Sequence, residues 1–131
     1  MRKKKYTVFT PHNLKPSPSN DEKIIAEVMA NFLKSNIIFV LRNSATTPDI
    51  KAIASGQYWE IKNIRGNNKN TISRALKGIY RQSENVILSL LRTQMPPQDA
   101  VGRARQKLSR ANRIKRLVII TKNLEILVIK P

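Results

Sequence analysis

The chain has 131 residues, with 25 lysines and arginines against 8 aspartates and glutamates, and a formal net charge of +17. A single domain of this size can bury its own core, and the charge indicates a polyanionic partner, either nucleic acid, an anionic membrane surface or an acidic protein. The lack of cysteine excludes disulfides and thiolate metal sites, and the lone histidine, His12, argues against mechanisms that need two imidazoles.

Residues 1–18 are basic, contain three prolines and have few apolar side chains. We expect a flexible leader here, followed by one domain over residues 19–131. The basic start lacks the apolar core of a signal peptide. No apolar run approaches the roughly 18 residues of a membrane span. The sequence therefore predicts a soluble protein.

The first element after the leader is predicted to be a helix over residues 21–34. Ser19 and Glu22 have the spacing of a capping box, and apolar residues then recur at helical spacing as far as Leu33. A short, fully apolar strand is predicted next, over residues 37–41.

Residues 49–63 are predicted to form a β-hairpin, because two extended runs flank Ser55-Gly56. If these two residues form the whole turn, Asp49 faces Lys62 and lies diagonal to Glu60. Side chains alternate between the two faces of a strand. The three charged side chains therefore share one face of the hairpin, and its apolar residues share the other.

The second half of the chain alternates helices with strands. The predicted helices cover residues 71–83 and 98–111, and the predicted strands cover residues 85–91, 117–121 and 126–129. From the first helix onward, the element order is α-β-β-β-α-β-α-β-β. This order favours an α/β (α+β) fold with a mixed central sheet flanked by helices.

Asp49 and Glu60 are the candidate metal ligands. Two carboxylates on neighbouring strands lie close enough to hold one cation jointly, and oxygen ligands suit Mg²⁺ or Mn²⁺. Lys62 would orient or deprotonate a water bound to the cation, or offset charge in the transition state. The alternative is a cross-strand ion-pair ladder on a solvated face, which needs no metal.

Two resemblances involve the same residues. Pro48-Asp49 followed by Glu60-Ile61-Lys62 resembles the PD-(D/E)xK motif of the restriction-endonuclease-like nucleases, whose core has a similar element order. Residues 19–130 also resemble the carboxy-terminal toxin domains of CdiA effectors of contact-dependent growth inhibition. The shared features include "PD", "WEIKN", "ENVILSL" and the basic "RARQKLSRANRIKRLVIIT". The VENN-type junction that precedes such toxin domains is missing.

The resemblance implies a metal-dependent nuclease toxin, because many CdiA toxin domains are tRNases. It also implies a cognate immunity protein, which would need an acidic surface. Action in the bacterial cytoplasm after delivery by a larger secreted effector is implied too. In the nuclease superfamily an acidic residue of the first helix commonly completes the metal site, and Glu22 is the candidate here. Capping of the helix is the alternative role of Glu22.

Between residues 62 and 116, basic residues outnumber acidic ones fourteen to two. Arg65, Lys69, Arg74 and Lys77 are the candidates for contact near the scissile phosphate, and Arg103 to Arg116 for contact with more distant backbone. Aromatic residues make up only 5% of the chain, which favours recognition of a structured RNA by its shape and backbone; that this RNA is tRNA is implied by the resemblance to CdiA toxin domains. A DNA endonuclease with the same site and a non-catalytic nucleic-acid-binding protein stay open as alternatives.

Overall fold

The computed structural model describes residues 5–42, 44, 46–110 and 113–131. Its elements are β1 (Val8–Phe9), α1 (Asn20–Leu33), β2 (Ile37–Phe39), β3 (Ile50–Ala52), β4 (Tyr58–Asn63), α2 (Thr71–Leu76), η1 (Ile79–Arg81, a 3₁₀ turn), β5 (Asn85–Ser89), α3 (Pro97–Leu108), β6 (Arg116–Ile120) and β7 (Ile126–Lys130). The strands form one seven-stranded sheet, in chain order from β1 to β7. Strand β1 pairs in parallel with β2, and β4, β5 and β6 pair in parallel, whereas the other neighbours are antiparallel. The predicted mixed sheet with flanking helices is confirmed.

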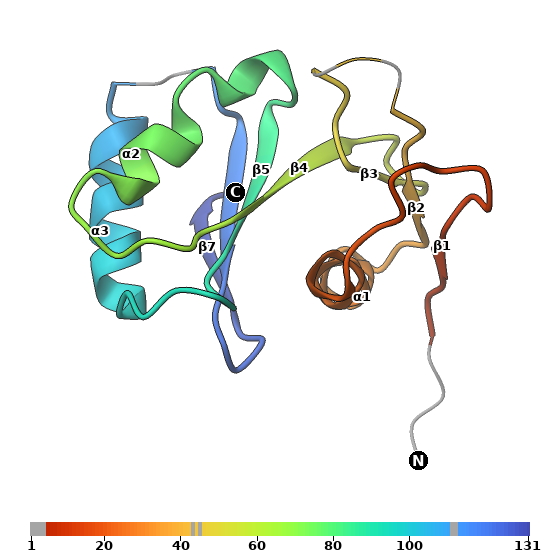
Figure 1. The fold of residues 1–131 in the computed structure, drawn as a ribbon, viewed down its shortest axis with the longest axis horizontal. Helices are drawn as coiled ribbons and strands as arrows, with labels where there is room; N and C mark the ends of the chain where they lie inside the picture. Colours follow the sequence, from red (N-terminus) through yellow and green to blue (C-terminus); the bar gives the residue numbers. More distant parts are fainter. Residues whose placement is uncertain (1–4, 43, 45, 111–112) are drawn as a thin grey trace.

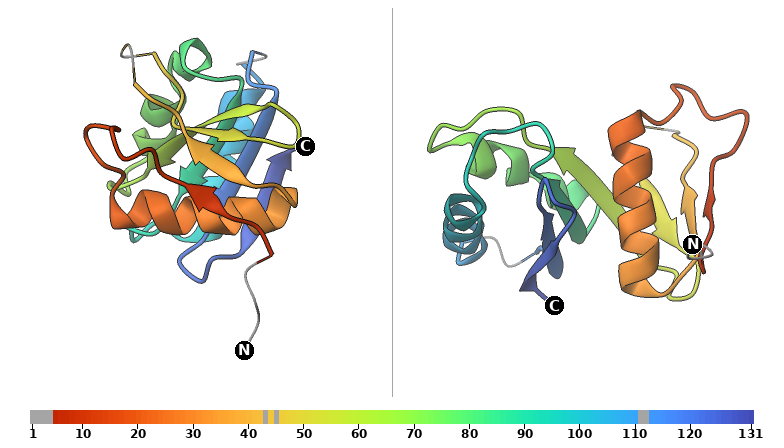
Figure 2. Two further views of the ribbon diagram at one scale, coloured as in Figure 1. Left: turned by 90° about the vertical axis from the view of Figure 1, so that its right-hand side faces the viewer. Right: turned by 90° about the horizontal axis from the view of Figure 1, so that it is seen from below.

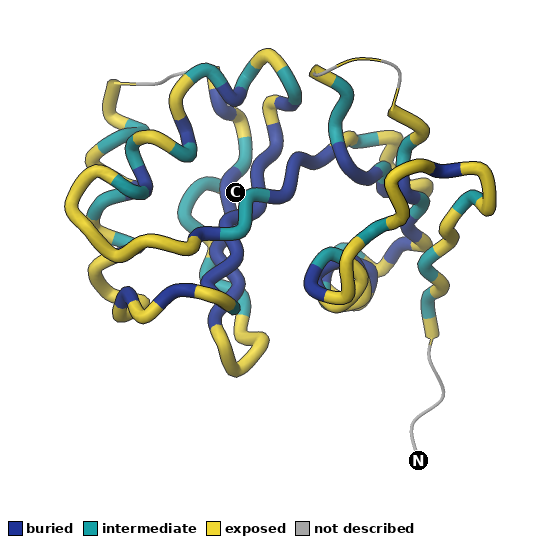
Figure 3. The backbone as a smooth tube through the Cα atoms, in the orientation of Figure 1, coloured by how far each residue is buried: buried dark blue, intermediate teal, exposed yellow. Residues whose placement is uncertain are grey.

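Helices cover opposite faces of the twisted sheet at its two ends. Helix α1 packs beneath the β2–β4 end, whereas α2 and α3 pack against the β5–β7 end (Figures 1 and 2). Each helix layer has its own hydrophobic cluster, and consecutive residues of β5 and β6 point alternately into the two clusters. Both faces of the central strands are therefore buried (Figure 3).

The predicted capping box starts α1. Ser19 Oγ accepts a hydrogen bond from the Glu22 backbone N–H at 3.1 Å, and Glu22 Oε1 accepts one from the Ser19 N–H at 3.0 Å. The neighbouring Asp21 instead binds Arg92, whose Nε and Nη2 donate to the two carboxylate oxygens at 2.8 and 2.9 Å. This bidentate pair joins the first turn of α1 to the segment that follows β5.

Residues 5–18, which were expected to stand outside the fold, take part in it. Val8–Phe9 pairs with β2 as strand β1, and Leu14 is buried at 6% exposure. The pairing continues the sheet past β2, whose edge would otherwise be open on that side. The short segment escaped prediction because two paired residues leave no periodic pattern in the sequence. The rest of the predicted leader, residues 1–4, lies outside the described residues.

The helix predicted over residues 71–83 is divided into α2 and η1. Gly78 lies between them with a positive φ of 69°, which glycine adopts without a side-chain clash. None of the helices in the described ranges is long and apolar enough to cross a membrane.

Candidate active site

The β3–β4 hairpin places Asp49 directly opposite Glu60. Ile50 pairs with Trp59 and Lys51 with Tyr58, and the same register extended by one residue brings the two carboxylates face to face. The turn is longer than Ser55-Gly56 alone, because the Ala52 N–H donates to the carbonyl of Gln57 at 2.8 Å and leaves residues 53–56 between the paired strands. The longer turn shifts the register by two residues, and a shift of two leaves every side chain on its predicted face.

Both carboxylates are buried. Asp49 is 9% exposed and Glu60 is 4% exposed. On the opposite face of the same strands, Ile50, Trp59 and Ile61 pack into the cluster beneath α1. Asp49 and Glu60 therefore lie on the face that α1 does not cover, which confirms the predicted separation of charged and apolar side chains.

Asp49 is held by two donors. Its Oδ2 accepts a hydrogen bond from the Ile61 N–H at 2.8 Å, and its Oδ1 accepts one from Arg42 Nη2 at 3.2 Å. The same Arg42 nitrogen lies 3.7 Å from Glu22 Oε2. Arg42 therefore bridges the carboxylate of the hairpin and that of α1, while the other oxygen of Glu22 caps its helix.

Glu60 is less well satisfied. Its Oε2 lies 3.7 Å from Lys62 Nζ, and its Oε1 is one of three buried side-chain atoms without a hydrogen-bond partner in the described part of the chain. Burial, followed by the charge of Asp49, raises the pKa of Glu60 to about 8. Burial also raises the pKa of Asp49 above its ordinary value. The two carboxyl groups therefore hold one proton between them at neutral pH. A bound dication can replace that proton.

A cavity of about 280 Å³ collects these groups. It is lined by Glu22, Arg42, Ser44, Thr47, Asp49, Glu60, Ile61, Lys62 and Gln82. The fold thus brings together the four predicted catalytic residues, which come from α1, the segment before β3, and β4.

The four predicted phosphate contacts lie outside this cavity. Lys69 and Lys77 each line a different cavity beside α2, and Arg74 is exposed on α2. Arg65 is also exposed. The hydrogen bond from Arg92, and at longer range the charge of Arg65, lower the pKa of Asp21, so Arg65 lies near the first turn of α1.

Four residues of the cavity were not among the predicted site residues: Arg42, Ser44, Thr47 and Gln82. The first three lie in the polar loop between β2 and β3, where no spacing rule connects a side chain to the hairpin. Gln82 follows η1 and reaches the cavity because the chain turns back there toward β4. Only the folded arrangement reveals these four residues.

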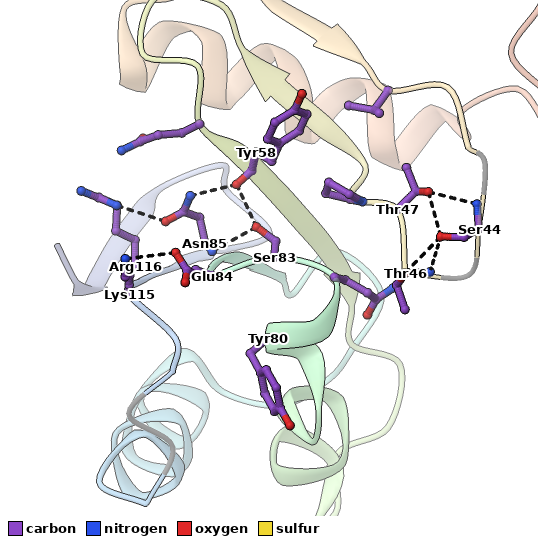
Figure 4. A pocket seen from close by; sticks show the side chains of 14 residues that line it. Ser44, Thr46, Thr47, Tyr58, Tyr80, Ser83, Glu84, Asn85, Lys115 and Arg116 are labelled. Carbon is purple, nitrogen blue, oxygen red and sulfur yellow. Dashed lines mark hydrogen bonds and ion pairs between the residues drawn. The ribbon is translucent and has the colours of Figure 1, made fainter.

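A larger cavity of about 710 Å³ adjoins the first and shares Ser44, Thr47 and Gln82 with it. Figure 4 shows its lining, which includes residues from β4, η1 and the starts of β5 and β6. The backbone carbonyl of Tyr58 accepts hydrogen bonds from Ser83 Oγ at 2.8 Å and Asn85 Nδ2 at 2.9 Å. These bonds fix the wall between β4 and β5.

The donor set of the smaller cavity suits a hard dication. Asp49 and Glu60 offer buried carboxylate oxygens, and Glu60 Oε1 lacks a partner among the described residues. No group of three or more His, Cys, Asp or Glu side chains in the described ranges is arranged to hold a metal. Water and substrate oxygens would therefore complete the coordination, as is usual for Mg²⁺ bound through one or two carboxylates.

Arg42→Gln is expected to tighten Mn²⁺ binding about fivefold. The guanidinium competes with a cation for Asp49, and it is 46% exposed. Removing its charge should therefore make the free energy of Mn²⁺ binding more favourable by about 1 kcal/mol. Calorimetric titration with Mn²⁺ would measure the change. Lys122→Gln, in the exposed turn after β6, should leave the affinity unchanged. A weaker affinity in Arg42→Gln would show that the arginine organises the carboxylates.

Comparison with known proteins places the chain in a family. Residues 45–126 match the contact-dependent growth inhibition CdiA C-terminal domain. A search of curated proteins found no match. The fold is similar to a solved structure described as a CdiA-CT/CdiI toxin and immunity complex from Burkholderia pseudomallei, with a TM-score of 0.62 and 16% identity over 95% of this chain and 99% of that one. Because the family match spans more than half of the sequence, the chain belongs to the contact-dependent growth inhibition CdiA C-terminal domain family.

Proposed function

We propose that this growth-inhibition toxin domain is a metal-dependent endonuclease with a PD-(D/E)xK-like site. The observation that carries the proposal is the pair of buried carboxylates, Asp49 and Glu60, opposed across the β3–β4 hairpin with one oxygen left without a partner among the described residues. A solvated ion-pair ladder would not bury its acids to this extent. Buried, perturbed carboxylates in a strongly basic chain favour catalysis over binding alone.

Asp49 and Glu60 would hold Mg²⁺ or Mn²⁺. When bound, the cation supplies Lewis-acid polarisation of a phosphate oxygen and lowers the pKa of a bound water. Lys62 Nζ, 3.7 Å from Glu60, is placed to orient the attacking water or to offset negative charge in the transition state. Arg42 can move from the carboxylates to a phosphate oxygen. Glu22 keeps Arg42 at the cavity and can accept a hydrogen bond from water.

RNA, and tRNA in particular, is the proposed substrate. The net charge of +17 supports a polyanion, and the dispersed basic residues favour recognition of the backbone of a structured RNA. Duplex DNA is the second candidate, since the carboxylate chemistry does not distinguish the two. The experiment below separates RNA from DNA cleavage and both from binding alone.

A cognate immunity protein is the proposed partner. The similar solved structure is described as a toxin and immunity complex. A protein that covers a surface with this charge needs complementary acidic groups. We propose that the domain is delivered as part of a larger effector and acts in the cytoplasm of the target bacterium.

Incubation of the purified chain with total tRNA and with duplex DNA, with Mg²⁺ or a chelator, tests the proposal. Cleavage of tRNA that needs Mg²⁺ is the expected result. Cleavage that persists in the chelator would contradict the metal-dependent mechanism. Cleavage confined to DNA would reassign the substrate, and binding of both polymers without cleavage would reduce the chain to a nucleic-acid-binding protein.

A further inference from the structure

Helices α2 and α3 border a groove lined by cations. One cavity of about 230 Å³ and another of about 250 Å³ share Lys107 and Arg110 in their walls. No aspartate or glutamate lines either cavity. We name the two cavities together the α2–α3 groove; its basic residues are Lys69, Lys77, Arg103, Lys107, Arg110 and Arg113.

The walls of the α2–α3 groove are held in place by its own cations. Arg103 Nη1 donates to the carbonyl of Lys69 at 2.8 Å, which fixes the loop before α2 against α3. The Arg113 guanidinium lies 4.6 Å from the centre of the Tyr80 ring. Both contacts leave the positive charges uncompensated, because a carbonyl and an aromatic ring carry no net charge.

Lys107 and Arg110 lie where the two cavities meet. Neither side chain makes a hydrogen bond or an ion pair within the described part of the chain. Six like charges around a shared groove repel one another unless an anion neutralises them. The groove is therefore suited to several negative charges rather than to one.

The α2–α3 groove leads to the candidate active site. Tyr80 lines both the groove and the larger cavity shown in Figure 4. That cavity in turn shares Ser44, Thr47 and Gln82 with the carboxylate cavity. The cavities thus adjoin in series, from Lys69 at one end to Asp49 and Glu60 at the other.

We propose that the α2–α3 groove is a second, non-catalytic site that binds consecutive backbone phosphates of the RNA cleaved at the carboxylates. The inference rests on the proposed nuclease function and adds the course of the substrate. The strand leaves the carboxylate cavity, passes the cavity of Figure 4 and Tyr80, and enters the groove. Lys69 and Lys77 then contact phosphate away from the scissile bond.

Binding without cleavage tests the groove directly. In an Asp49→Asn background, Lys107→Ala/Arg110→Ala should make tRNA binding less sensitive to salt. The slope of log affinity against log salt concentration should become less steep by about 1.4 to 1.8, the value for two lost phosphate contacts. Lys15→Ala/Lys122→Ala removes the same charge from exposed positions outside all four cavities and should leave the slope unchanged. If the groove variant and the control variant have the same slope, the proposal is overturned, even if both slopes differ from that of the parent chain.

Cleavage by chains with an intact Asp49 separates this proposal from the nuclease function. Lys107→Ala/Arg110→Ala should raise KM for tRNA about tenfold with kcat unchanged. Cleavage of a dinucleotide, whose only phosphodiester is the scissile one, should not change. If the wild-type chain cleaves no nucleic acid but the salt slope still falls, the groove stands and the nuclease proposal fails. If tRNA is cleaved and neither KM nor the slope changes, the groove fails alone.

Discussion

Asp49→Asn and Glu60→Gln are each expected to lower kcat for Mg²⁺-dependent cleavage about 10³-fold. Either change removes one of the two protein ligands proposed for the cation, and loss of its charge stabilisation costs several kcal/mol in the transition state. Each amide matches the size of the acid it replaces, so the hairpin should keep its packing. Single-turnover cleavage of tRNA at saturating enzyme would measure the rate.

Two further amide substitutions provide the control. Asp99→Asn, in the first turn of α3, and Glu125→Gln, before β7, remove an exposed carboxylate outside the cavity and should cleave at the wild-type rate. Thermal unfolding of all four variants would check that they are folded. If Asp49→Asn and Glu60→Gln are folded and cleave as fast as these controls, the proposed site is wrong.

Mn²⁺ affinity is expected to rise about tenfold per pH unit between pH 6 and pH 8 and then to level off. Because the pKa of Glu60 is about 8, the cation must displace a proton below that pH, and each released proton makes affinity change tenfold per unit. Calorimetry in buffers of different ionisation enthalpy would count the protons. Glu60→Gln has no such proton to release and should bind Mn²⁺ weakly, with little dependence on pH.

Without metal, the same group links stability to pH. The folded-state pKa of Glu60 is raised from 4.5 to about 8, so its stabilising contribution is full below pH 4.5 and is lost as pH rises through 8. Between pH 6 and pH 9 we expect a loss of about 2 to 3 kcal/mol in the free energy of unfolding, less than the whole pKa shift implies because the interval from pH 4.5 to pH 6 lies outside this range. Urea unfolding at pH 6 and pH 9 would measure it. An equal loss in Glu60→Gln would assign the effect to other groups.

Much of the fold follows from local sequence rules. The capping box at Ser19 and the apolar residues after it specify α1, and buried runs specify β5 and β6. The shared face of Asp49, Glu60 and Lys62 was predictable even with a wrong turn. The register error was an even number of residues, which moves partners but leaves faces unchanged.

The remaining features depend on tertiary contacts. Arg42 meets Asp49 only because the loop after β2 folds back over the hairpin, and no periodicity records that contact. The predicted phosphate contacts follow Glu60 closely in sequence, but α2 places Lys69 and Lys77 on the α2–α3 groove. The predicted relationship to CdiA toxin domains is confirmed by the family match, and the PD-(D/E)xK assignment stays a proposal.

The residues around the carboxylate cavity are widely separated in sequence. Glu22 comes from the start of α1, Asp49 and Glu60 from the hairpin, and Gln82 from the turn before β5. An extended chain keeps these groups apart, so it has neither the raised pKa values nor a shared cation. The chemical capacity of the site is therefore a property of the folded chain alone, and it is lost and regained with the fold.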